Sequence, residues 1–262
     1  MIKDIEIAMK ITTWNVNSIN VRLPHLLELL EKEAPTVIGL QELKCSNDKY
    51  PVEEIEALGF HSAVNGQPTY NGVALLSTKE IVDVVLDIPG FEDEEKRVIA
   101  GTINGVRVVN AYVPNGQSPD SEKYEYKLSW LKAFTAYIQD LLSLYSEVIV
   151  IGDYNIAPND DDVHNPETWK GKILCTDQER AAFADLQKLG LVDGLRIEAQ
   201  PKGIFTWWDY RQGGFEKNSG IRIDHLLLSR VLSRRFISSS VHLNYRAMER
   251  PSDHAPVSVI LK

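Results

Sequence analysis

The stretch EVIVIGDYN, from Glu147 to Asn155, decides the fold. Its four consecutive β-branched residues predict a fully buried strand, and Gly152 and Asp153 end that strand in a polar turn. Other apolar runs end, or are broken, in the same way, at Asn15, Gln41-Glu42, Asp224-His225 and Asp253-His254. Because loops at one end of a sheet packing carry function on a rigid base, we expect these side chains to lie together.

The rest of the chain alternates strand-like and helix-like segments. Apolar runs predict strands over residues 11–16, 36–40, 72–77, 81–86, 98–103, 106–112, 205–208, 223–229 and 257–261. Helical spacing and capping residues predict helices over residues 23–30, 51–58, 121–144 and 176–190. The Asn104-Gly105 pair predicts a tight hairpin. Many hairpin-linked strands with a few helices predict an α/β fold of two packed sheets flanked by helices.

The composition is that of an ordinary globular protein. The chain has 262 residues, of which 44% are hydrophobic and 25% charged, and it contains no linker or repeat, which predicts one domain. It has no uncharged apolar run near the roughly 20 residues that a membrane span needs, and residues 1–10 lack the apolar core of a secretory leader. Two cysteines, Cys45 and Cys175, are typical of a reducing compartment. We therefore expect a cytoplasmic protein that is not bound to a membrane.

The charge is distributed unevenly along the chain. The net charge is −9, but residues 200–262 carry ten Lys or Arg and five Asp or Glu, a net of +5. Residues 1–199 carry eighteen and thirty-two, a net of −14. A basic quarter on an acidic body can steer a polyanion onto one face. From charge alone, an ordinary solvated surface explains the asymmetry equally well.

The acidic residues at the strand ends need a cation, because clustered carboxylates repel one another and are costly to desolvate. Carboxylate and amide oxygens suit Mg²⁺ or Mn²⁺, and the sequence has no spaced Cys/His set for zinc. Each residue alone has an ordinary explanation: Glu42 as a helix cap, Asp153 and Asn155 as a turn, Asp224 in an ion pair, His254 in a loop. Their repetition at five strand ends favours a functional site.

The motifs at these strand ends are similar to those of the exonuclease III family of DNA-repair nucleases, within the endonuclease/exonuclease/phosphatase superfamily. The resemblance runs from Ile11 to Leu261. It rests on Trp14-Asn15-Val16-Asn17, Gln41-Glu42, Tyr112-Val113-Pro114-Asn115-Gly116, Gly152-Asp153-Tyr154-Asn155, Arg222-Ile223-Asp224 and Pro251-Ser252-Asp253-His254. It implies a four-layer α/β sandwich in one domain, residues 9–262, after an N-terminal extension of residues 1–8.

The resemblance also implies a role for each matching residue. Glu42 holds a divalent cation, Mg²⁺ or in its place Mn²⁺, with Asn15 and Asp253 in or near its coordination shell. Asp153 activates the attacking water, and Asn155 orients that water. Three further residues serve the scissile phosphate: His254 contacts it, Asp224 holds His254, and Tyr112 lies against it. If a second ion is bound, its expected contacts are Asp153, Asn155 and His254.

Basic and aromatic residues of the C-terminal quarter are the expected DNA contacts, because phosphate contacts and aromatic packing hold a duplex without reading its sequence. They are Trp207, Trp208, Arg211, Lys217 and Arg222. Leu174 stands where many family members have glycine, in a loop that they place near the DNA. We expect this leucine to narrow the approach of an internal abasic site.

The resemblance implies a Mg²⁺-dependent DNA phosphodiesterase that acts as a monomer on duplex DNA with nicks, gaps, 3′ ends or abasic sites. The expected activity is 3′→5′ exonuclease, which AP endonuclease and 3′-phosphatase activities can accompany. Two alternatives stay open. A phosphoinositide or sphingomyelin phosphatase would share the core, but the sequence has no membrane-binding amphipathic stretch. A non-catalytic DNA-binding scaffold would be expected to have lost one of Glu42, Asp153, Asp224 or His254.

Overall fold

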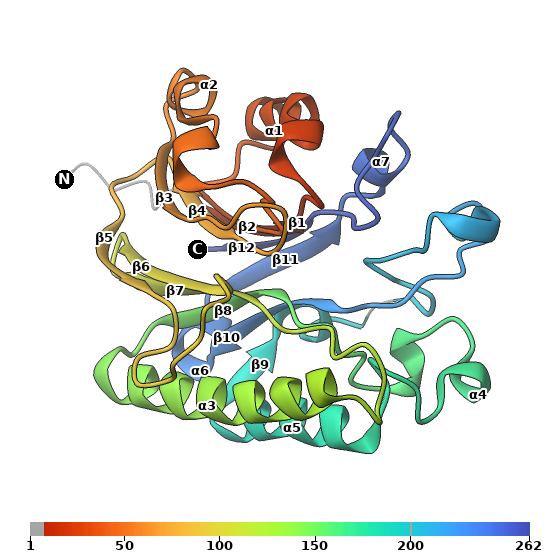
Figure 1. Ribbon diagram of the computed structural model, residues 1–262. Helices are drawn as coiled ribbons and strands as arrows, with labels where there is room; N and C mark the ends of the chain where they lie inside the picture. Colours follow the sequence, from red (N-terminus) through yellow and green to blue (C-terminus); the bar gives the residue numbers. More distant parts are fainter. Residues whose placement is uncertain (1–7, 200) are drawn as a thin grey trace.

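The computed structural model describes residues 8–199 and 201–262, in which two six-stranded sheets pack against each other (Figure 1). The first sheet has the order β11-β12-β1-β2-β4-β3, and the second has the order β5-β6-β7-β8-β10-β9. The extension predicted for residues 1–8 lies outside the described residues, apart from Ala8. Its boundary therefore stays a prediction.

Both sheets are mixed. In the first sheet β1 and β2 are parallel, and in the second β7 and β8 are parallel, whereas the other neighbouring strands are antiparallel. The first sheet consists of β1 (Met9–Asn15), β2 (Val37–Gln41), β3 (His61–Asn65), β4 (Val73–Ser77), β11 (Phe236–Val241) and β12 (Val257–Leu261). The second consists of β5 (Val82–Leu86), β6 (Val98–Ile103), β7 (Val106–Tyr112), β8 (Val148–Asp153), β9 (Leu191–Asp193) and β10 (Asp224–Ser229).

The helices cover the outer faces of the sheets. Figure 1 shows α1 and α2 on the first sheet and α3 and α5 on the second. The helices are α1 (Ile19–Glu33), α2 (Val52–Glu56), α3 (Glu122–Leu144), α4 (Pro166–Trp169), α5 (Asp177–Lys188), α6 (Arg230–Ser233) and α7 (Leu243–Arg246). The predicted capping box of Thr176 and Glu179 begins α5, and Ser121 caps α3. In the described part of the chain, none of these helices has the length and apolarity of a membrane span.

Three apolar layers hold these elements together. The central layer, between the sheets, includes Ile11, Val259, Val108 and Ile149. One outer layer packs α1 and α2 on the first sheet, and the other packs α3 and α5 on the second. The predicted four-layer α/β sandwich is therefore confirmed.

Two strand predictions differ from the structure. Residues 205–208 are not a regular strand, because Trp207 makes only isolated bridges, to Ile221 and His254. The strands β3, β9 and β11 were not expected from the sequence; each lies at the edge of a sheet, and β9 is only three residues long. The partly exposed, polar-rich segments of β3 and β11, such as FISSSV, lack the apolar runs that mark the central strands.

Candidate active site

Neighbouring strands of the second sheet bring three candidate residues into line. Tyr112 ends β7, Asp153 ends β8, and Asp224 begins the antiparallel strand β10. The strand register pairs Tyr112 with Asp153 and Asp153 with Asp224. In the first sheet, Asn15 ends β1 and Glu42 directly follows β2. The ends of these strands therefore place the five residues close together at one end of the sandwich, as predicted.

Gly152 is required by the approach of β7 to β8. Its φ is +147°, and a Cβ atom at this position would lie 1.9 Å from the carbonyl oxygen of Ala111. Any side chain would therefore push β8 away from β7 and move Asp153 out of line with Tyr112. The glycine before Asp153 is a packing requirement of the site.

The Asn15 side chain joins the two sheets at the site. Its amide nitrogen donates to Glu42 Oε1 at 3.0 Å and to Asp153 Oδ2 at 2.9 Å. Its carbonyl oxygen accepts the backbone N–H of Asn17, which fixes the direction of the amide. Asn15 thus lies beside the predicted metal position and bridges two acids through its nitrogen, with its oxygen turned away from them.

Glu42 has 19% of its side chain exposed and is more accessible than Asp153 and Asp224. Tyr112 donates its hydroxyl to Glu42 Oε1 at 2.8 Å, and the Lys44 ammonium lies 2.8 Å from Oε2. Burial alone would raise the pKa of Glu42, but Lys44 and the hydrogen bonds from Asn15 and Tyr112 hold it below its ordinary value. Glu42 is therefore a charged oxygen donor facing the open side of the site.

His254 and Asp224 form a buried pair. His254 Nδ1 lies 2.9 Å from Asp224 Oδ2, and Nε2 lies 3.6 Å from Asp153 Oδ2. Burial disfavours the charged imidazolium, but Asp224 and Asp153 outweigh it and raise the pKa of His254 to about 10. The ring is therefore cationic at neutral pH, with Asp224 fixing its orientation.

Asp153 lies at the centre of the network and is 1% exposed. Its Oδ1 accepts the backbone N–H of Asn155 at 2.9 Å. Burial raises its pKa, the His254 cation opposes that shift and Asp224 adds to it, and the result is a pKa of about 7. An acid in this range can accept a proton near neutral pH.

The donor set fits a hard divalent cation. Ligand atoms of Asp153, Asp224 and His254 lie within 4.8 Å of one another, and Glu42 is joined to Asp153 through Asn15. Asp253 lies beside this group, where its two oxygens accept hydrogen bonds from Trp207 Nε1 and Asn17 Nδ2. Carboxylate oxygens dominate the set, as Mg²⁺ and Mn²⁺ require.

Comparison with known proteins agrees with this geometry. Residues 12–254 match the Endonuclease/Exonuclease/phosphatase family. The chain belongs to this family. Exodeoxyribonuclease III of Haemophilus influenzae is 36% identical over 95% of this chain and 98% of its own length. The resemblance inferred from the sequence is thereby confirmed.

Solved structures of family members superpose closely on this chain. The 3′ phosphatase NExo from Neisseria, bound to a product DNA hairpin, has a TM-score of 0.96 and 44% identity, covering 97% of this chain and 99% of its own. An AP endonuclease from Archaeoglobus fulgidus has a TM-score of 0.93 and 36% identity, with coverage of 97% and 99%. The family fold therefore extends over nearly the whole chain.

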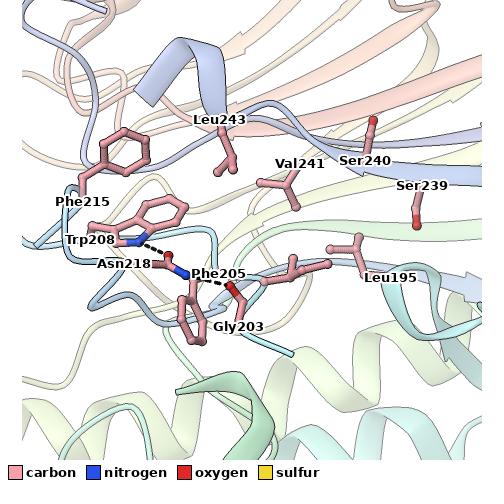
Figure 2. Close-up of a pocket in the computed structure, with 11 residues that line it drawn as sticks. Leu195, Gly203, Phe205, Trp208, Phe215, Asn218, Ser239, Ser240, Val241 and Leu243 are labelled. Atoms are coloured by element: carbon pink, nitrogen blue, oxygen red, sulfur yellow. Dashed lines mark hydrogen bonds between the residues drawn. The ribbon is translucent and has the colours of Figure 1, made fainter. Parts of the chain in front are cut away.

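Two of the predicted DNA contacts are wrong, because their side chains are buried. Trp208 is 1% exposed and lines an apolar cavity of about 380 Å³ beside Phe205 and Phe215 (Figure 2). Its indole nitrogen donates to Asn218. Arg222 is also 1% exposed, and it donates to Asp162 and Asp193, each at 2.7 Å. Both side chains stabilise the interior.

The other predicted DNA contacts differ in exposure. Arg211 and Lys217 are exposed and line a groove of about 430 Å³ that reaches Trp207. Trp207 is half-buried and holds Asp253. Leu174 is 5% exposed and packs in an apolar cluster with Ile221 and Ile223, so it is a third predicted DNA contact that is wrong, because its side chain does not face solvent. Arg211 and Lys217 are therefore the two predicted DNA contacts whose side chains are exposed.

Sequence reasoning gave no role to several residues that hold the site together. Asn115 donates to Asn155 Oδ1 at 3.0 Å, and its position in the Tyr112 motif was the available signal. Lys127 contacts the backbone of both asparagines from within α3. A lysine inside an amphipathic helix gives no such signal, since most are solvated.

The buried Arg222 network predicts a loss of acid stability in Arg222→Met. Burial would raise the pKa of Asp193 and Asp162, but Arg222 holds both below their ordinary value. The stability that these two carboxylates give to the fold is therefore complete above about pH 4, their ordinary pKa. It is lost as the pH falls through their pKa values in the folded protein, which are lower. Without the cation these pKa values rise, so we expect acid unfolding to begin at higher pH.

Circular dichroism against pH and urea unfolding at pH 7 measure this effect. Removing one partner of a buried pair typically costs about 3–5 kcal/mol. Arg211→Met, at an exposed arginine, is the control and should change stability by less than about 0.5 kcal/mol. Equal acid midpoints for Arg222→Met and the wild type would contradict the structural role of Arg222.

Proposed function

We propose that the chain is a metal-dependent DNA-repair nuclease with 3′→5′ exonuclease activity, accompanied by 3′-phosphatase and AP endonuclease activity. The observation that carries this proposal is the continuous network from Glu42 through Asn15 and Asp153 to His254. It combines an accessible carboxylate, a buried acid and a fixed cation at one end of the sandwich. Relatives named as exodeoxyribonuclease, 3′ phosphatase and AP endonuclease support it.

The metal is proposed to be Mg²⁺, with Mn²⁺ as a substitute. Glu42 would hold it, with Asp153 as a second carboxylate and with Asn15 and Asp253 beside it. A bound cation neutralises charge that develops on a phosphate under attack. A second ion, if the enzyme uses one, would contact Asp153, Asn155 and His254, and the His254 ring would then have to lose a proton to coordinate it.

Protein side chains are proposed to move the proton and to bind the phosphate. Asp153 accepts a proton from the attacking water, and Asn155 orients that water from beside it. The His254 imidazolium, held by Asp224, donates to the negatively charged phosphate. The Tyr112 hydroxyl, next to Glu42, lies against the same phosphate. The proposed base, Asp153, and the His254 imidazolium would thus act from neighbouring positions, since their side-chain atoms lie 3.6 Å apart.

The proposed substrate is duplex DNA with nicks, gaps, 3′ ends or abasic sites. Arg211 and Lys217 line the groove beside Trp207, and such residues bind phosphates without reading sequence. We propose that the protein acts on this DNA as a monomer in the cytoplasm. A non-catalytic scaffold does not need the retained Glu42–Asp153–His254 network, and a lipid phosphatase does not need a basic groove of this kind.

Glu42→Gln tests the metal assignment. The amide keeps the size of the side chain but removes the charge that holds a hard cation. We expect turnover of end-labelled duplex DNA to be lost in ordinary Mg²⁺, partly restored by high Mg²⁺ or by Mn²⁺, with an unchanged melting temperature. Full activity in ordinary Mg²⁺ would remove Glu42 from the metal site, and turnover of an inositol phosphate by the wild type would favour the lipid phosphatase.

Asp153→Asn separates chemistry from binding. An amide cannot accept the proton, so cleavage should fall by about 10²–10⁴-fold, the usual effect of losing a general base. Binding of duplex DNA should be retained or tighter, because one negative charge is removed. Single-turnover cleavage and a gel-shift titration measure the two quantities. Cleavage within about tenfold of wild type would contradict the proposed role of Asp153.

Leu174 is proposed to set the balance between exonuclease and AP endonuclease activity. Its φ is +73°, and its side chain packs against Ile221 and Ile223. Ile223 directly precedes Asp224 in the sequence. An abasic enzyme must accommodate a flipped-out sugar, whereas a 3′ terminus frays at little cost. Because the leucine side chain faces this cluster, it would act on the sugar through the position that it gives to the loop backbone. We therefore propose that 3′-end trimming exceeds internal AP cleavage.

Leu174→Gly should shift the ratio of activities toward AP sites by a few-fold, or about 1 kcal/mol. The cavity costs roughly 2–5 kcal/mol, and relief of the left-handed backbone returns about 1–2 kcal/mol of that. Paired duplexes, one nicked and one with an internal abasic analogue, measure the ratio, and a thermal melt measures stability. A lower melting temperature with both activities falling equally would mean that Leu174 only packs the interior.

A further inference from the structure

A buried ion pair lies behind the candidate active site. Lys127 of α3 and Glu179 of α5 are both 0% exposed, and Lys127 Nζ lies 2.5 Å from Glu179 Oε1. Neither residue is part of the proposed catalytic machinery. The pair is packed closely, since a Cβ atom on Gly116 would lie 3.0 Å from Lys127 Cδ.

The Lys127 ammonium also donates to two backbone carbonyls of site loops. It lies 2.7 Å from the carbonyl oxygen of Asn155 and 3.2 Å from that of Asn115. Asn155 has a left-handed backbone, with φ of +49°, and its side chain donates to Val113 O and, at 3.4 Å, to Asp153 Oδ2. One ammonium group therefore holds the loops that follow β7 and β8.

Glu179 joins a third loop, the one before α5, to the Lys127 ammonium. Its Oε1 accepts the backbone N–H of Leu174, and its Oε2 accepts the backbone N–H and the hydroxyl of Thr176. The carboxylate thus has three donors besides Lys127. Because every polar atom of the pair has a partner, the pair forms a fully connected network between α3, α5 and three loops.

Stability alone does not account for an ion pair at this depth. Desolvation of two charges offsets most of their attraction, and well-packed apolar residues commonly replace such pairs at no loss of stability. The pair does something that an apolar pair cannot, because its hydrogen bonds fix the direction of backbone carbonyls. Those carbonyls belong to the residues that surround Asp153.

We propose that Lys127 and Glu179 are positioning residues that fix Asn155, and through it the Asp153 carboxylate, for the chemical step. This inference rests on the proposed nuclease function. Lys127 contacts neither substrate nor metal, and it acts through the carbonyl of Asn155. Displacement of a reacting group by about 1 Å can cost about 10²-fold in rate, so loss of this bond should be visible in kcat.

The test compares Lys127→Met and Glu179→Gln with the wild type on end-labelled duplex DNA in Mg²⁺. We expect kcat to fall by about 10–100-fold in Lys127→Met, with KM within about threefold, because the DNA-facing groove is untouched. Raising Mg²⁺ should not restore the rate, in contrast to Glu42→Gln. Glu179→Gln keeps the size of the side chain, and it should also lower kcat.

Lys10→Met is the matched control. Lys10 also joins a glutamate side chain and a backbone carbonyl, both of Glu33, but it lies on the other outer layer. This variant should lower the melting temperature without changing kcat.

The outcomes separate the inference from the proposed function. A wild type without nuclease activity would refute the proposed function itself. An active wild type with unchanged kcat in Lys127→Met, whatever its melting temperature, would overturn the positioning role alone. If Lys127→Met does not fold, Glu179→Gln decides: a lower kcat at unchanged KM supports the role, and an unchanged kcat overturns it.

Discussion

The two sheets are held in a fixed position relative to each other, and the rest of the site depends on that position. The hydrogen bonds of the Asn15 amide require it. Glu42 belongs to the first sheet and Asp153 to the second, and the amide can reach both only if the strand ends coincide. The apolar layer between the sheets sets their spacing. Gln41 and Asn110 add a buried hydrogen bond of 2.6 Å across the same interface. Polar pairing of this kind penalises any slip of one sheet past the other, since unpaired amides would remain buried.

The site was largely predictable because its residues interrupt apolar strands. Asp153 and Asp224 lie at the ends of apolar, buried strands, where a carboxylate does not contribute to packing. Glu42 directly follows a short buried strand. A buried acid inside a sheet requires partners, so its sequence position carries information about the site. The same reasoning gave the two-sheet architecture, since buried central strands have apolar runs, and the strands that it missed are short or polar edge strands.

The wrong predictions concern residues whose partners lie far away in the sequence. Arg222 follows the same pattern as a DNA-binding arginine, but Asp162, from a loop after β8, and Asp193, at the end of β9, both pair with it. Trp207 and Trp208 are adjacent in sequence, yet one faces Asp253 and the other faces an apolar cavity. Net charge and local composition cannot distinguish a buried arginine or tryptophan from an exposed one, because burial depends on segments that are distant in the sequence. Lys127 escaped notice for the same reason.

Several residues in and beside the candidate site have a left-handed backbone. Asn17, Glu42, Lys44, Asn155 and Leu174 all have positive φ, although none is glycine. Asparagine tolerates this conformation, but for the others it costs of order 1–3 kcal/mol each. Such residues persist only where surrounding bonds over-determine them. The carbonyl of Glu42 accepts the backbone N–H of Ser18 at 2.8 Å, and Glu179 holds the N–H of Leu174. The rigid sandwich and these hydrogen bonds therefore hold the backbone beside Glu42 and Asp153 in conformations that a free chain would rarely adopt.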